Sequence, residues 1–125
     1  MPYYAHIRQD ENGQTIYQTV AEHLTGTAAL CREFAADFGA EADGDLMGLA
    51  HDLGKCTDAF QKRLLEGGPV VDHTTAGMLT CIKMKRPSAA ACVAGHHGGL
   101  LDVGNLRTDR AGEATLSGRF KKGVE

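Results

Sequence analysis

The hydrophobic positions in the first third of the chain recur with the spacing of an amphipathic helix. In residues 19–38, TVAEHLTGTAALCREFAADF, apolar side chains repeat at intervals of three and four, with Thr19 as a candidate N-cap and Gly39 at the end. The face expected to be buried consists of Val20, Leu24, Cys31, Phe34, Ala35 and Phe38. His23 lies beside this face, so its ring is expected to point toward the interior.

Four shorter helices are predicted after this one. They span about residues 45–53, 57–65, 73–85 and 87–97. Gly54 ends the first of them, and Pro87 opens the last. The buried face of the helix over residues 45–53 is expected to comprise Leu46, Leu49, Ala50 and Leu53. No segment shows sustained alternation of apolar and polar residues, so the pattern predicts an all-α fold, a bundle of about five short helices.

The helical pattern ends after Leu101. Residues 102–125 are rich in glycine, charged and short polar side chains, which predicts a loop with at most one weak strand or hairpin. We therefore expect residues 1–101 to form the folded core and residues 102–125 to form a loop-rich C-terminal segment.

Composition is typical of one soluble domain. The chain has 125 residues, of which 42% are hydrophobic and 23% charged, and no apolar run is long enough to cross a membrane. A net charge of −3 argues against a protein that holds nucleic acid by bulk electrostatics. The N-terminus lacks the pattern of a signal peptide, and no two of the four cysteines form a CxxC pair. We therefore expect free thiols and a cytoplasmic location.

Titratable residues interrupt the apolar segment GLAHDLGK, residues 48–55. Burying His51, Asp52 and Lys55 without partners costs several kcal/mol, and a metal ion is a partner that His and Asp share. Adjacent His51 and Asp52 offer two ligands about 100° apart around a helix, which suits two metal ions sharing the carboxylate. Lys55 follows one turn later, where it either reaches a phosphate or is an ordinary lysine at a helix C-terminus.

Five of the six histidines lie at or near the ends of predicted helices. They are His23, His51, His73, His96 and His97. Any one of them alone would more often be a structural residue, but the set indicates a metal centre. Imidazole combined with carboxylate favours Mn, Ni, Co, Fe or Zn, so we expect divalent transition-metal ions, two in number, with Mg still open.

These motifs also resemble a known family. AEHL, GLAHDLGK, FQKRL, VDHTTAG and GHHGGLLD, in this order, closely resemble the HD nuclease domain of Cas3, the target-degrading protein of type I CRISPR systems. HDLGK is typical of the HD phosphohydrolase superfamily as a whole, whereas FQ, DHTTAG and GHHGG together are specific to the Cas3 branch. The resemblance covers nearly all of residues 5–110.

The resemblance implies a metal-dependent phosphodiesterase. The metal ligands that it implies are His23, His51, Asp52, His73, His96 and His97. In this scheme Asp52 belongs to the first metal, with His23 and His51, and bridges to the second. The second metal is held by His73, His96 and His97. Asp52 and Lys55 are the implied catalytic residues, with Lys55 steadying the substrate phosphate. Thr74 shapes the site without ligating, and His6 has no assigned role.

The implied activity is cleavage of single-stranded DNA in antiviral defense, and either endonuclease or exonuclease action fits. The implied partners are single-stranded DNA, the Cas3 helicase domain and the type I CRISPR surveillance complex (Cascade), with no membrane. Two alternatives stay open: a shortened, non-catalytic HD module that binds the surveillance complex, and an HD phosphohydrolase of nucleotides. Family members continue through further helices to a last aspartate ligand. We expect these C-terminal helices to be missing here, so that the metal at His23 binds more weakly than the other.

Overall fold

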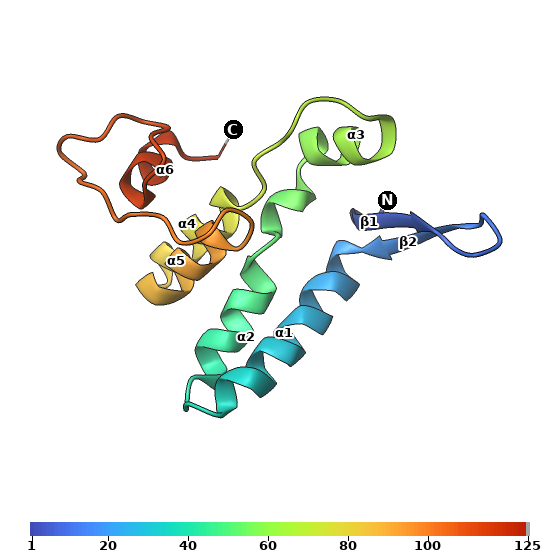
Figure 1. Ribbon diagram of the computed structural model, residues 1–125, viewed down its shortest axis with the longest axis horizontal. Coiled ribbons are helices and arrows are strands. Elements are labelled where there is room, and N and C mark those ends of the chain that lie inside the picture. The colour runs from blue at the N-terminus through green and yellow to red at the C-terminus, as the bar shows by residue number, and fades with distance from the viewer. Residues whose placement is uncertain (125) are drawn as a thin grey trace.

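The computed structural model describes residues 1–124, which form a β-hairpin followed by a bundle of helices (Figure 1). The strands β1 (Tyr4–Gln9) and β2 (Thr15–Thr19) pair antiparallel and lead directly into α1 (Val20–Ala36). The elements that follow are α2 (Glu41–Ala50), the 3-10 helix η1 (Leu53–Cys56), α3 (Asp58–Glu66), α4 (Thr75–Lys83), α5 (Pro87–Gly95) and α6 (Leu116–Lys122). The mostly helical architecture confirms the predicted fold class.

The hairpin is the first departure from the prediction, which placed no strand before residue 102. β2 is exposed along most of its length, so its sequence carries no alternation of buried and exposed positions. The hairpin is held instead by β1, where the side chain of Ala5 is buried in a small cluster with Val20 and Leu24 of α1. These contacts depend on the tertiary fold and leave no periodic signal in the sequence.

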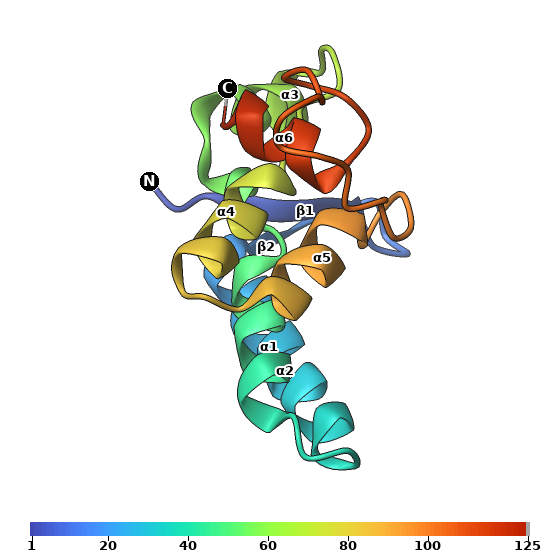
Figure 2. The same cartoon turned by 90° about the vertical axis from the view of Figure 1, so that its left-hand side faces the viewer.

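α1 begins as predicted, with a reciprocal capping box. The Thr19 hydroxyl accepts from the Glu22 backbone N–H, and the Glu22 carboxylate accepts from the Thr19 backbone N–H. The predicted buried face is wrong at Phe34, which is 66% exposed, and at Phe38, which is 75% exposed, whereas Ala35 is buried as predicted. There α1 packs against α2 alone, and the tip of this helix pair projects away from the other elements (Figures 1 and 2).

α2 starts four residues earlier than predicted and ends at Ala50, directly before the HDLGK motif. Leu49, expected to be buried, is 39% exposed. Gly48 lies where α2 crosses α1, and a Cβ at this position would collide with the backbone of Ala28. The absence of a side chain at Gly48 therefore allows the two helices to pack closely.

α4 and α5 form within their predicted ranges, and α3 ends one residue beyond its predicted range. Thr57 caps α3 through its hydroxyl, and Pro87 opens α5 at its first turn. The main core lies between α2, α4 and α5 and consists of Ala50, Met78, Cys81, Ala89, Ala90, Val93 and Ala94. These mostly small side chains bring the three helices close together.

The loop prediction for residues 102–125 is wrong at its end, where α6 forms. Thr115 caps α6 by accepting from the Gly118 backbone N–H, and Leu116 packs against the main core. A single apolar residue per turn is too weak a pattern to predict a helix of this length. Among residues 1–124, no helix is long and apolar enough to cross a membrane.

Candidate metal centre

Asp52 lies at the junction between α2 and η1, and its carboxylate is the centre of a group of histidines. It is 3% exposed. Its Oδ2 lies 2.9 Å from His23 Nε2 and 3.2 Å from His51 Nε2. Its Oδ1 lies 3.2 Å from His96 Nε2 and 3.5 Å from His73 Nε2. Each carboxylate oxygen therefore faces its own set of imidazoles.

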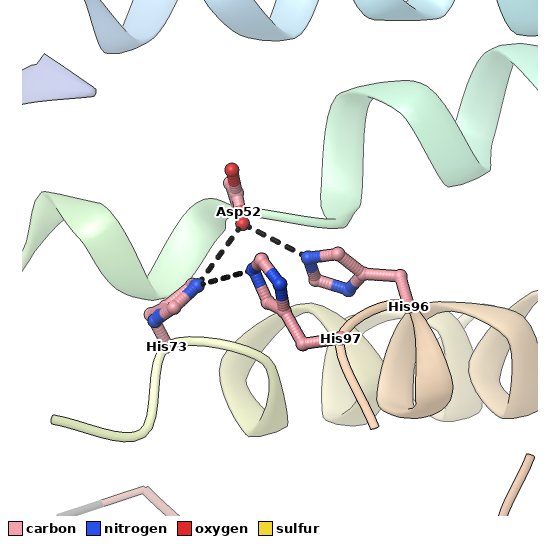
Figure 3. A group of neighbouring side chains, drawn as sticks. All are labelled: Asp52, His73, His96 and His97. Carbon is pink, nitrogen blue, oxygen red and sulfur yellow. Dashed lines mark hydrogen bonds and ion pairs between the residues drawn. The ribbon is translucent and has the colours of Figure 1, made fainter. Parts of the chain in front are cut away.

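The Oδ1 side comprises Asp52, His73, His96 and His97 (Figure 3). His73 comes from the segment before α4, whereas His96 and His97 follow the last turn of α5. One ligand atom from each of the four residues lies within 4.8 Å of the others, and His73 Nε2 is 2.9 Å from His97 Nε2. The structure thus brings together all four residues that the sequence placed at one metal.

The Oδ2 side comprises the imidazoles of His23 and His51, whose Nε2 atoms lie 3.0 Å apart. The ring of His23 points inward from α1, as expected from its place on the helix. The ligand atoms of His6, His23 and Asp52 also lie within 4.8 Å of one another. No role was predicted for His6, because nothing in the linear pattern places β1 beside α1.

Backbone carbonyls fix the tautomers of three of these rings. Nδ1 lies 2.7 Å from the Gly48 carbonyl in His51, 2.7 Å from the Val93 carbonyl in His96 and 3.3 Å from the Val71 carbonyl in His73. A carbonyl only accepts, so Nδ1 carries the proton and the neutral ring presents the lone pair of Nε2 to Asp52. Metal-binding histidines are oriented in this way. Facing lone pairs about 3 Å apart repel one another, and a shared cation relieves this, so the donor set fits divalent metal ions.

The surroundings of Asp52 shift the pKa values of this carboxyl group and of several histidines beside it. Burial lowers the pKa of His23 and of His73 below the ordinary value, so both rings are neutral and able to ligate near pH 7. A second proton on His96 Nε2 would be donated to Asp52, and this hydrogen bond to the charged ring raises the pKa of His96. Burial alone would raise the pKa of Asp52, but the hydrogen bonds that the Lys55 ammonium and the neighbouring imidazoles, when they carry a second proton, donate to it outweigh burial and hold that pKa far below its usual range.

The comparison with protein families agrees with this geometry. The model of the HD domain family matches residues 20–116, which run from the start of α1 to the start of α6. The chain belongs to the HD domain family. HD domains are typically metal-dependent phosphohydrolases, and the His/Asp group of this chain is arranged to hold a metal. No curated protein matches the chain.

In the HD domain, the segment that carries His73 is held by a close contact at Gly54 and by hydrogen bonds to the Asp72 carboxylate. A Cβ at Gly54 would collide with the backbone of His73, so the glycine of the HDLGK motif lets that segment lie directly against η1. The Asp72 carboxylate accepts from the backbone N–H groups of Thr74 and Thr75 and from the Thr75 hydroxyl, 2.6 Å away. These contacts fix the start of α4 and, with it, the ring before it.

Two further side chains support the HD domain site through contacts that were not predicted from the sequence. Arg119 of α6 donates from Nη1 to the Thr74 hydroxyl and to the Ala94 carbonyl, at 2.9 and 2.8 Å. It thereby ties α6 to the segments that carry His73 and His96. Lys55 is buried, and its ammonium lies 3.0 Å from Asp52 Oδ2. A role for Lys55 in holding substrate phosphate stays a prediction, and its observed partner is the central carboxylate.

Proposed function

We propose that this chain is a metal-dependent nuclease of the Cas3 type, which cleaves single-stranded DNA in type I CRISPR interference by two-metal phosphodiester hydrolysis. The observation that carries this proposal is the arrangement around Asp52, where one carboxylate oxygen faces His23 and His51 and the other faces His73 and His96. A single carboxylate between two sets of imidazoles is suited to bridge two ions. The motifs FQ, DHTTAG and GHHGG favour the Cas3 branch over other HD domains.

The chain's own residues would hold the ions and orient the substrate. His23, His51 and Asp52 would hold one ion, and Asp52 with His73, His96 and His97 would hold the other. When bound, such a pair acidifies the attacking water and stabilises charge on the attacking and leaving oxygens of a phosphodiester. Lys55 adds a fixed positive charge beside Asp52 Oδ2, which keeps the carboxylate ionised and in place.

A cleft next to the Oδ1 side offers room for the substrate. It has a volume of about 520 Å³ and is bounded by the segment 70–74, by residues 112–114 and by α6. His73 and His97 lie at its inner edge, and the cations Arg119 and Lys122 contribute to its wall. The carboxylates of Asp72 and Glu113 also line the cleft, and Lys122 is paired with Asp72 at 3.2 Å, so a phosphate would meet Arg119 next to the metal ligands.

The acidic net charge of the chain supports a dependence on partners for gripping DNA. In this proposal a Cas3 helicase domain feeds single-stranded DNA to the site, and the type I surveillance complex recruits the nuclease. The alternative of a nucleotide phosphohydrolase is compatible with the HD family match, since that match does not distinguish between substrates.

Hydrolysis assays with the purified chain test this proposal. Single-stranded DNA, duplex DNA and nucleoside triphosphates are incubated with added Mn, Ni or Co, and with chelator as a control. We expect weak cleavage of single-stranded DNA that requires metal and that disappears in Asp52→Asn. The matched control is Asp37→Asn at the exposed end of α1, which should retain activity.

Two outcomes would contradict the proposal in different ways. Release of phosphate from nucleotides with intact DNA would identify a nucleotide phosphohydrolase. Binding of two ions without hydrolysis of any of these substrates, even with the helicase domain and the surveillance complex present, would identify a non-catalytic binding module.

A further inference from the structure

The ammonium of Lys55 is held by three acceptors, one for each of its N–H groups. These are Asp52 Oδ2 at 3.0 Å, the Ala5 carbonyl at 3.3 Å and His6 Nε2 at 3.3 Å. Two of the three belong to β1, and the side chain of Lys55 is only 5% exposed. The N-terminal hairpin therefore completes the surroundings of a charge that contacts the central carboxylate.

Gln61 of α3 fastens β1 in this position. Its Oε1 accepts from the Tyr4 backbone N–H at 3.0 Å, and its Nε2 donates to the Tyr4 carbonyl at 2.8 Å. The same Nε2 donates to the Lys55 carbonyl at 2.8 Å. One side-chain amide thus fixes β1 and the backbone of Lys55 relative to each other. Ala5, the residue after Tyr4, is buried against α1.

We propose that the β-hairpin is part of the active site and that His6 is a positioning residue, which holds the Lys55 ammonium against Asp52 Oδ2. A carboxylate that is not held can rotate about its last side-chain bond. With Oδ2 anchored by Lys55, Oδ1 stays directed at His73 and His96. The hairpin precedes the segment matched by the HD family, so this role belongs to residues that the family match leaves out. The effect on hydrolysis rests on the proposed function, whereas the contact itself does not.

His6 is also close enough to Asp52 and His23 to bind a metal directly, and this is the competing reading. The contact with Lys55 argues against it, because His6 Nε2 has a single lone pair and that lone pair already accepts from the Lys55 ammonium, whereas a carboxylate oxygen such as Asp52 Oδ2 has a second one left for an ion. The two readings predict different behaviour for His6→Gln. A glutamine amide oxygen accepts a hydrogen bond in place of Nε2, but as a neutral amide it is a much weaker ligand for transition metals than imidazole.

The first test observes the Lys55 ammonium in the metal-free chain by ¹H–¹⁵N NMR of lysine side chains. A buried ammonium with three acceptors exchanges slowly with water, so we expect a signal in the wild type that is absent in Lys55→Met. The signal should persist in His6→Gln and be lost or strongly broadened in His6→Ala. Arg8→Ala, an exposed change on the same strand, is the matched control and should leave it intact. An unchanged signal in His6→Ala would overturn the proposal.

The second test is a calorimetric titration of the same variants with Mn²⁺. We expect His6→Ala to weaken one ion by about ten- to a hundredfold, the usual effect of losing an outer partner, and His6→Gln to restore most of the affinity. In a Lys55→Met background, His6→Ala should cause no further loss. Equal losses in His6→Gln and His6→Ala would instead make His6 a metal ligand and overturn the positioning role. Neither readout requires DNA cleavage, so a failure of the proposed nuclease activity would be recognised separately.

Discussion

At the scale of single residues, the site depends on how Asp52 is surrounded. Its two oxygens face different histidines, and carbonyls at Gly48 and Val93 hold His51 and His96 in the tautomer that ligates. The motifs in the sequence were sufficient to select the histidines that converge here. They did not predict that His6 contacts the same carboxylate through Lys55, because that contact requires β1 to lie beside η1.

Gly54 provides a prediction at this scale. Gly54→Ala should destabilise the fold by about 1–3 kcal/mol, because the added methyl group forces the backbone of His73 away from η1. The displaced ring should also weaken metal binding. Urea unfolding measures the first effect and calorimetry the second. Gly26→Ala is the control, since nothing lies near that position, and equal stability of the two variants would show that the close contact is not important.

At the scale of elements, capping residues were the most informative part of the sequence. Thr19, Thr57 and Pro87 mark the helix starts correctly, because each acts through neighbours in the chain. The hairpin and α6 were missed, because both are short and gain their order from long-range contacts such as Gln61 with Tyr4 and Arg119 with Thr74. Local patterns predict local interactions, and these two elements depend on distant ones.

The uneven burial of the helices gives a second prediction. Met78→Ala, at a fully buried position of α4, should lower the free energy of unfolding by about 2–5 kcal/mol. Phe34→Ser, at the exposed outer half of α1, should change it by no more than about 0.5 kcal/mol. Denaturant unfolding of both variants compares them directly. A large loss in Phe34→Ser would show that the outer half of α1 is covered in solution.

At the scale of the whole molecule, the charged site makes stability depend on pH. Burial lowers the pKa of His23 and of His73, so protonating them is harder in the folded chain than in the unfolded one. The folded state therefore loses stability as the pH falls through the unfolded-state value of about 6.5. His96 acts in the opposite direction, because its raised pKa adds stability below about pH 6.5 that is lost as the pH rises.

We therefore predict that the metal-free chain becomes less stable between about pH 7 and pH 5, because the histidines with lowered pKa outnumber His96. A further loss is expected below about pH 4, where Asp52 and Asp72, whose pKa values are held low, must take up protons. Urea midpoints in chelator at each pH measure both steps. His73→Gln should flatten the first step, and a rise in stability toward pH 5 would mean that His96 dominates.

The central claim is that Asp52 is shared by two metal ions. The most direct measurement is an anomalous difference map from crystals soaked in Mn²⁺, for the wild type and for Asp52→Ala. The account predicts two peaks in the wild type, one beside Oδ2 near His23 and His51 and one beside Oδ1 near His73, His96 and His97, and neither peak at comparable occupancy in the variant. Two fully occupied peaks in Asp52→Ala, or ions in the wild type that do not contact Asp52, would contradict it.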